Sequence, residues 1–191
     1  MGCFYAYLVQ ILWAAWLTYW IVSATSVKTT RQRESIASRS AHFIPMVTAT
    51  AVILTPPFYG AGFLFARFVP SSAAVGWCGR ALVFAGLSFS AWARIHLGRN
   101  WSSRVTLKED HELICSGPYA LVRHPIYTGL LLAIAGTALV EGQWRALLAL
   151  LLMGISFWRK LRVEERLMNL TFADDYRNYC ARTAALIPFV L

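Results

Sequence analysis

The chain alternates long apolar runs with short polar segments that carry most of its charge. Hydrophobic residues occupy 58% of its 191 positions and charged residues only 14%, whereas about a quarter of a typical soluble domain is charged. An apolar run of roughly 20 residues is long enough to cross a bilayer as a helix. The runs cover residues 4–24, about 43–69, 73–95, 126–140 and 144–158. We therefore predict an all-α integral membrane protein with about five transmembrane helices.

The second run contains Pro56-Pro57, so it can be interpreted as one kinked span or as a hairpin of two short helices. A single span leaves only Arg67, Arg80 and Arg145, of the 18 Lys and Arg residues, on one side of the membrane. Lys and Arg concentrate in cytoplasmic loops, and this favours the single span. We expect a multi-pass protein with its N-terminus outside and its active site and C-terminus in the cytoplasm.

The net charge of +9 does not indicate a nucleic-acid-binding protein. The basic residues lie in short segments between apolar runs, whereas nucleic-acid-binding domains gather them on one soluble face. The cysteines Cys3, Cys78, Cys115 and Cys180 are scattered, without the spacing of metal ligands. We expect membrane lipids as partners, no nucleic acid and no metal.

The fourth run carries Gly129, Ala133 and Gly136 on one helix face, and small residues at this spacing let two helices approach closely. We expect the fourth and fifth runs to form a tight hairpin joined by "EGQ". Antiparallel packing then makes neighbours of "VRHPIY" (122–127) and "RVEER" (162–166), although they are about 40 residues apart. Such a cluster of ionisable groups at the membrane surface is a candidate functional site.

Each polar residue of this cluster also has a purely structural interpretation. Arg123 and His124 could anchor the chain at the interface, with Pro125 starting a helix at its favoured first position. Glu164 and Glu165 could be solvated helix residues paired with basic neighbours one turn away. The rigid "SGPY" turn just upstream and the convergence of all these groups favour the functional interpretation.

Two stretches, "HELICSGPYALVRHPIYTG" (111–129) and "RVEERLMNLTFADDYRNYCARTAALIPF" (162–189), resemble the isoprenylcysteine carboxyl methyltransferase family. The C-terminal half of that family is similar to phospholipid methyltransferases. The resemblance covers about residues 94–189 and rests on GPY, RHPxY, the paired Glu, F-x-x-x-Y-x-x-Y and a late Pro. It implies a membrane methyltransferase that uses S-adenosylmethionine on a lipophilic, prenylated or lipid-like acceptor. From the apolar runs we expect an N-terminal three-span membrane region (1–95). We expect residues 96–191 to form the catalytic region, with a helical hairpin and cytoplasmic C-terminal helices.

The resemblance further implies roles for individual residues. The family's cofactor contacts fall on Arg104, where the family has Gln, and on His111, Glu112, Leu113, Ile114, Tyr119, His124, Pro125, Ile126, Tyr127 and Glu164. The substrate-side Arg of the family falls on Lys160, with Arg162 beside it. Glu164 can pair with the cofactor's ammonium, and imidazole or phenol groups can donate to its carboxylate or ribose. The catalytic candidates are His124, Arg123 and Glu165, with no base assigned.

Several functions are compatible with these residues. A carboxylate acceptor, as in isoprenylcysteine O-methylation, is already ionised and needs alignment more than a base. A phospholipid-type amine acceptor would first have to lose a proton. An NADPH-dependent enzyme related to sterol reductases could hold the 2′-phosphate with Arg159, Lys160 and Arg162. A membrane scaffold whose basic loops bind anionic lipid is the non-enzymatic alternative.

Overall fold

Four long helices dominate the computed structural model, which describes residues 2–24, 44–52, 62–98 and 113–188. They are α1 (Gly2–Ser23), α3 (Ala73–Leu97), α4 (Pro125–Glu141) and α5 (Trp144–Arg182). Residues 44–52 are also helical, and η3 (Phe63–Phe65) and η5 (Gly117–Ala120) are short 3-10 turns. Extended pairing within the described residues is limited to two isolated bridges. The predicted all-helical class is confirmed for this part of the chain.

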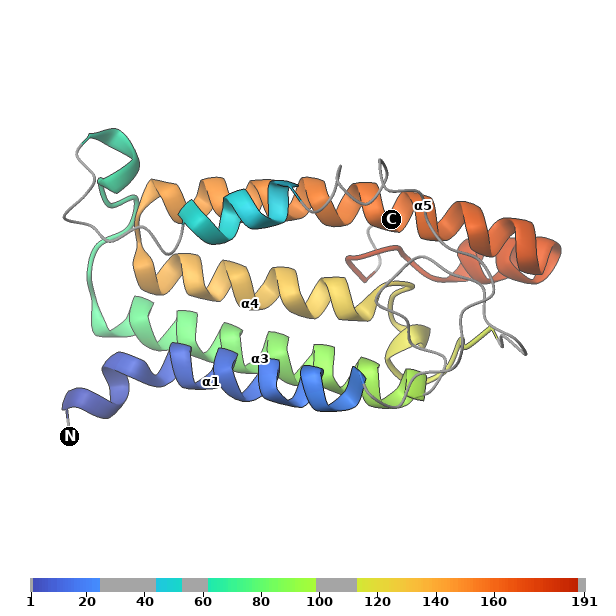
Figure 1. The fold of residues 1–191 in the computed structure, drawn as a ribbon, viewed down its shortest axis with the longest axis horizontal. Helices are drawn as coiled ribbons and strands as arrows, with labels where there is room; N and C mark the ends of the chain where they lie inside the picture. Colours follow the sequence, from blue (N-terminus) through green and yellow to red (C-terminus); the bar gives the residue numbers. More distant parts are fainter. Residues whose placement is uncertain (1, 25–43, 53–61, 99–112, 189–191) are drawn as a thin grey trace.

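The long helices lie side by side in the order α1, α3, α4, α5 (Figure 1). α1 and α3 run in the same direction, α4 returns antiparallel to α3, and α5 returns antiparallel to α4. One end of the bundle therefore gathers the last turns of α1 and α3, the start of α4 and the second half of α5. The predicted boundary between regions 1–95 and 96–191 falls in the last turns of α3.

Glycines bring α3 and α4 into backbone contact. A Cβ atom built on Gly86 would lie 2.4 Å from the carbonyl oxygen of Gly129, and one built on Gly129 would lie 2.5 Å from that of Gly86. Gly79 and Gly136 form a second reciprocal pair two turns away. The predicted small-residue face of the fourth run is thus a close-packing face. Its partner is α3, because α3 carries matching glycines, whereas we expected the close approach within the α4–α5 hairpin.

The hairpin between α4 and α5 forms as predicted. Gly142 ends α4 in the left-handed conformation (φ 68°), and Gln143 precedes α5. α5 is much longer than the predicted fifth run, because residues 159–182 contain no Gly or Pro to end the helix. The expected cytoplasmic C-terminal helices are therefore the continuation of α5, which kinks at Ala173 (φ 42°).

Val52 and Phe68, in the two described parts of the second run, both lie far from the last turn of α1. The backbone oxygen of Val52 accepts a hydrogen bond from Arg145 Nη1 (3.2 Å), and the Phe68 amide donates to Gly142 (2.9 Å). Both contacts lie at the α4–α5 turn, at the end of the bundle opposite Ser23. These positions agree with a single passage along the bundle; Pro56-Pro57 lie outside the described residues.

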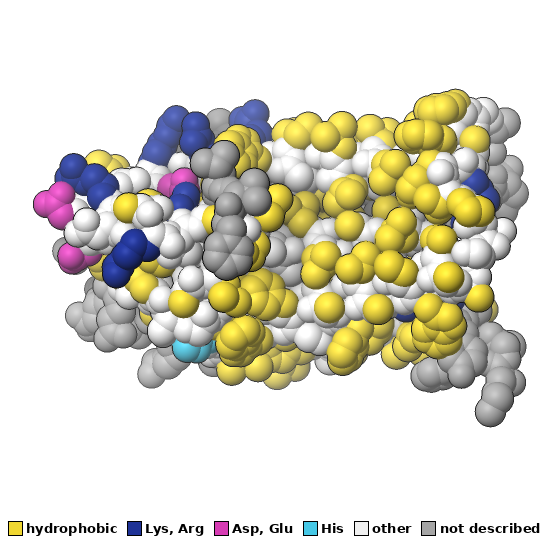
Figure 2. All heavy atoms as spheres, turned by 180° about the vertical axis from the view of Figure 1, so that it is seen from behind, with side chains coloured by type: hydrophobic (Ala, Val, Ile, Leu, Met, Phe, Trp, Pro, Cys, Tyr) yellow, Lys and Arg dark blue, Asp and Glu magenta, His cyan; other side chains and the backbone are white. Residues whose placement is uncertain are grey.

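The face of the bundle seen in Figure 2 is apolar along most of its length and charged towards one end. Large exposed side chains include Phe84 and Ile95 on α3 and Leu151 and Trp158 on α5. By length and composition α3 could cross a membrane, and Tyr7–Ser23 and α4 are shorter apolar helices. Extensive apolar surface of this kind is typical of sites that contact other proteins or a membrane.

The reciprocal glycine contacts predict opposite outcomes for two Gly→Ala substitutions. Gly129→Ala would place a methyl group against the α3 backbone and should reduce the free energy of unfolding by roughly 1–3 kcal/mol. Gly154→Ala on α5 is the matched control, because nothing lies within 4 Å of its new Cβ. It should be neutral or stabilise by up to about 1 kcal/mol through helix propensity. Thermal unfolding in one detergent measures both, and equal midpoints would contradict the close approach.

Candidate active site

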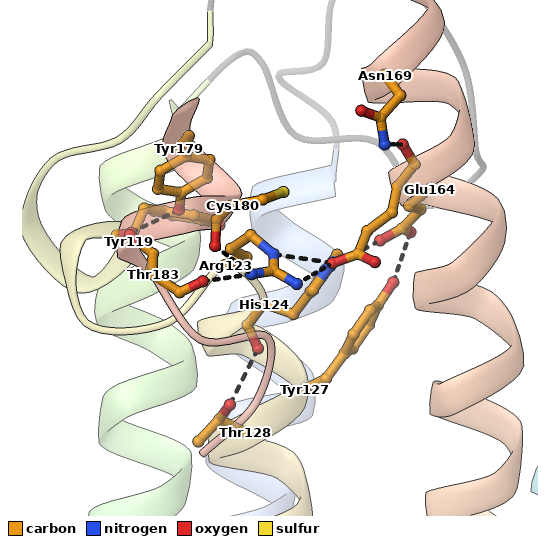
Figure 3. Close-up of polar contacts among 11 residues, drawn as sticks. Tyr119, Arg123, His124, Tyr127, Thr128, Glu164, Asn169, Tyr179, Cys180 and Thr183 are labelled. Carbon is orange, nitrogen blue, oxygen red and sulfur yellow. Dashed lines mark hydrogen bonds and ion pairs between the residues drawn. The ribbon is translucent and has the colours of Figure 1, made fainter. Parts of the chain in front are cut away.

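The site forms where α4 begins, because the first polar groups of α4 face the two adjacent glutamates of α5 (Figure 3). Pro125 occupies the first turn of α4, where its missing amide donor costs nothing. His124 therefore stands as the helix-capping residue, at the mouth of the α4–α5 hairpin. The hairpin returns Glu164 and Glu165 to the same level, so the predicted proximity of residues 122–127 and 162–166 is confirmed.

His124 lies between both carboxylates. Its Nδ1 is 3.5 Å from Glu164 Oε2, and its Nε2 is 3.4 Å from Glu165 Oε1. Tyr127 stands one turn further along α4, and its hydroxyl donates to Glu164 Oε1 at 2.6 Å. The rings of His124 and Tyr127 stack with their centroids 5.6 Å apart. A protonated His124 can thus donate to both glutamates at once.

Arg123 connects Glu165 to the C-terminal part of the chain. Its Nε and Nη2 lie 2.9 Å and 2.8 Å from Glu165 Oε1. Its Nη1 donates to the backbone oxygens of Cys180 and Thr183. Every nitrogen of this guanidinium has a protein partner, so Arg123 holds the site together.

Residues 183–186 form a strap that runs back along the start of α4. The amides of Arg123 and His124 donate to the backbone oxygens of Ala184 (2.8 Å) and Ala185 (3.0 Å). Thr128 Oγ1 donates to the backbone oxygen of Leu186 at 2.6 Å. The strap therefore fixes the backbone of His124, whose imidazole lies between the glutamates. Sequence reasoning missed this contact, because main-chain hydrogen bonds require no particular side chains.

The strap reaches α4 because α5 changes direction at Ala173. Beyond the kink, Tyr176 and Tyr179 are buried, with ring centroids 6.0 Å apart. The Tyr179 hydroxyl donates to the backbone oxygen of Tyr119 in η5 at 2.5 Å. These are the two tyrosines of the F-x-x-x-Y-x-x-Y pattern, and they tie the end of α5 to the "SGPY" turn.

The charges of His124, Glu164 and Glu165 stabilise one another. Burial alone would lower the pKa of His124, but hydrogen bonds and charge from Glu164 and Glu165 outweigh burial and raise it. Burial would raise the pKa of Glu164, yet His124, Lys160 and Tyr127 together hold it below its usual range. His124 and Arg123 likewise lower the pKa of Glu165. These shifts favour the anionic form of both carboxylates and the cationic form of the imidazole.

Several other predicted site residues surround this cluster. Lys160 lies one turn before Glu164 on α5, with its Nζ 5.5 Å from the Tyr127 ring centroid. Tyr119 is buried, and burial raises its pKa. The negative charge of Glu164 is the second cause of this shift. Pro125 is fully buried, and Ile126 packs against the apolar core of Tyr127, Phe157 and Leu161.

Of the remaining predicted residues, three lie in the described part of the chain, and none of these forms a hydrogen bond or ion pair with the cluster there. Leu113 and Ile114 are half-buried. Arg162 is exposed and lies over the Trp158 ring, 5.4 Å from its centroid, on the opposite face of α5. Arg104, His111 and Glu112 lie outside the described residues. Within the described part of the chain, no three His, Cys, Asp or Glu side chains are grouped as metal ligands would be.

Comparison with known proteins finds one family. The pattern of the Isoprenylcysteine carboxyl methyltransferase (ICMT) family matches residues 79–170, which include α4 and both glutamates. A protein-S-isoprenylcysteine O-methyltransferase of Schizosaccharomyces pombe is 32% identical over 101 residues, covering 51% of this chain and 43% of that protein. A probable protein-S-isoprenylcysteine O-methyltransferase of Oryza sativa subsp. indica is 31% identical over 111 residues, covering 58% of this chain and 53% of the relative.

A relative with a different name matches over a similar length. The nickel-cobalt-cadmium resistance protein NccN of Alcaligenes xylosoxydans xylosoxydans is 28% identical over 114 residues, covering 59% of this chain and 52% of that protein. The chain spans about half the length of the curated relatives it matches. The family match, residues 79–170, runs from within α3 to within α5.

The contacts of Arg123 predict that its loss destabilises the fold. Arg123→Gln would leave Glu165 without its strongest partner in a half-buried position and free the strap, at a cost of roughly 3 kcal/mol. Arg177→Gln is the matched control, because the exposed pair of Arg177 with Asp174 contributes at most about 1 kcal/mol. Thermal unfolding in detergent compares them, and equal destabilisation would show that Arg123 is an ordinary surface arginine.

The raised pKa of His124 predicts a pH-dependent stability. Its contribution is complete below the unfolded-state value of about 6.5 and is lost as pH rises through the folded-state pKa. The unfolding midpoint should therefore fall with rising pH above about 6.5, and less steeply in His124→Gln. His96→Gln, which removes an exposed imidazole paired with Ser116, should keep the wild-type slope. An unchanged slope in His124→Gln would mean that the imidazole is neutral between the glutamates.

Proposed function

We propose that this chain is a membrane methyltransferase of the isoprenylcysteine carboxyl methyltransferase family, whose pattern matches residues 79–170. It transfers a methyl group from S-adenosylmethionine to a lipophilic acceptor at the cytoplasmic surface of the bilayer. The acceptor is a carboxylate of the isoprenylcysteine type, as the names of the S. pombe and rice relatives suggest. The substrate and the site roles below are proposals for this chain.

One observation carries the proposal: an anionic Glu164 is held in place by hydrogen bonds beside an apolar seam. Tyr127 donates to one of its oxygens, and His124 approaches the other. The amino-acid part of S-adenosylmethionine presents an ammonium, for which a preorganised carboxylate is the matching partner. The residues therefore fit the cofactor, with Glu164 for the ammonium and the Tyr127 and His124 side chains to orient Glu164.

The cofactor supplies a methyl group on a positively charged sulfur. A carboxylate acceptor is already ionised, so the chain's own groups must orient the acceptor and exclude water. Lys160 places one positive charge over the Tyr127 ring, next to Phe157 and Leu161. It can pair with the acceptor's carboxylate while the apolar residues contact the lipid chain. Arg123 and Glu165 are positioning residues, because their charges are satisfied by each other and by the strap.

The level of the cluster along the bundle supports an enzyme that works between two phases. Trp158 is the last large exposed apolar side chain on α5 before a run of basic residues. Glu164 follows six residues later, which is about 9 Å along a helix. A cofactor can reach this level from water, while a lipophilic acceptor approaches from the apolar belt below it.

Glu164→Gln should weaken binding of S-adenosylhomocysteine roughly 30-fold, because a charge-assisted pair worth about 2 kcal/mol is lost. Asp174→Asn is the matched control, since Asp174 carries the same charge on the surface of the same helix and is exposed. Calorimetry on detergent-purified protein measures both variants. Unchanged affinity in Glu164→Gln would remove Glu164 from the cofactor site.

The same preparation separates the proposed function from its alternatives. Binding of NADPH without binding of S-adenosylhomocysteine would indicate a reductase, and binding of neither by folded protein would favour a scaffold. With a radiolabelled methyl donor and a farnesylated cysteine acceptor, a methyl ester releases volatile methanol in base. A product that keeps its label in base would indicate an amine acceptor.

A further inference from the structure

α5 presents two different faces at the level of the site. Phe157, Lys160 and Glu164 face α4. The opposite face carries Leu151, Ile155 and Trp158, which are 60%, 46% and 51% exposed, and then the exposed arginines Arg159, Arg162 and Arg166. Positions three, four and seven apart lie on one side of a helix. We call Arg159, Arg162 and Arg166 the basic stripe.

The basic stripe lies just beyond the apolar belt. Dark blue side chains gather at the end of the molecule where the yellow belt stops (Figure 2). With Trp158 as the edge of the belt, Arg159 and Arg162 follow about 1.5 Å and 6 Å further along the helix axis. The polar headgroup layer of one leaflet is about 5–8 Å thick. Arg159 and Arg162 are thus at headgroup level, and Arg166, about 12 Å beyond Trp158, lies on the aqueous side of that layer.

The described acidic side chains leave the basic stripe uncompensated. Glu164 and Glu165 are turned inward to His124 and Arg123. Asp174, beyond the stripe, pairs with Arg177. Arg159 and Arg166 form no ion pair with any acidic residue in the described part of the chain, and Arg162 lies over the Trp158 ring. The outer face of α5 therefore carries a net positive charge where it would meet lipid headgroups.

We propose that the basic stripe, with Trp158 at its base, is a binding surface for the phosphate headgroups of anionic phospholipids. The arginine fork matches phosphate oxygens in geometry and charge, and a tryptophan at the interface tolerates both the apolar and the polar side. The surface is separate from the Glu164 site, because it occupies the other side of the helix. The inference shares with the proposed function only the placement of the chain in a bilayer and does not depend on methyl transfer.

Native mass spectrometry of the full chain in detergent, with equimolar phosphatidylglycerol and phosphatidylcholine, tests the surface. Each arginine at an anionic surface favours binding by about fivefold. The wild type should therefore retain phosphatidylglycerol at least roughly fivefold in preference, and the preference should weaken between 0.1 M and 0.5 M salt. The Arg159→Gln, Arg162→Gln double variant should retain both lipids about equally.

The control is the Arg177→Gln, Arg182→Gln double variant, which removes the same charge from exposed positions beyond the kink of α5. It should keep the preference for phosphatidylglycerol. Equal loss in both double variants would mean a general charge effect and would overturn the proposal, as would the absence of any preference in the wild type. Displacement of the lipid by millimolar glycerol 3-phosphate would overturn it in favour of a soluble phosphate. Because the readout is lipid retention, failure here leaves the cofactor experiment on Glu164 unaffected.

Discussion

Two adjacent, largely buried carboxylates, Glu164 and Glu165, determine which partners the rest of the site must supply. An unpaired buried carboxylate is strongly unfavourable, so Glu164 and Glu165 require cations at fixed positions. His124 approaches both, and Arg123 binds Glu165 while its remaining donor reaches the strap. The start of α4, the middle of α5 and the C-terminal strap are therefore held together by one charge balance. Removing either His124 or Arg123 leaves a partly buried carboxylate with one charged partner fewer.

The length of the hairpin explains why the glutamates stand where they do. α4 has 17 residues and rises about 24 Å from its first residue to its last. The rise along α5 from Trp144 to Glu164 is about 30 Å, so Glu164 passes just beyond the start of α4. The residue at that level is His124, which precedes the helix. The glycine contacts between α3 and α4 then hold α4 against α3, because the two backbones touch and leave little room for one helix to slide along the other.

Much of this arrangement was predictable from the sequence, and the exceptions have physical reasons. Hydrophobic runs and the "EGQ" turn predicted the α4–α5 hairpin, and the hairpin predicted that His124 faces Glu164. Small residues at Gly129 and Gly136 indicated a close helix contact without identifying the partner, which is α3. The strap uses main-chain groups that any sequence offers. The kink of α5 at Ala173 has a positive φ without a glycine, so no residue type in the sequence predicted a kink at this position.

The two faces of α5 connect membrane depth to the site. Between Trp158 and Glu164 the helix contains no Gly or Pro, and its kink comes only at Ala173. A rigid segment of this kind fixes the height of Glu164 above the edge of the apolar belt. Anionic headgroups bound to Arg159 and Arg162 on the outer face would hold α5 at one depth. Lys160 on the inner face would then stay at the level where a lipid-borne carboxylate leaves the hydrocarbon, with Glu164 one turn further towards the water. A shift of one helical turn, about 5 Å, would separate that carboxylate from Lys160, so lipid binding outside and acceptor alignment inside depend on the same register.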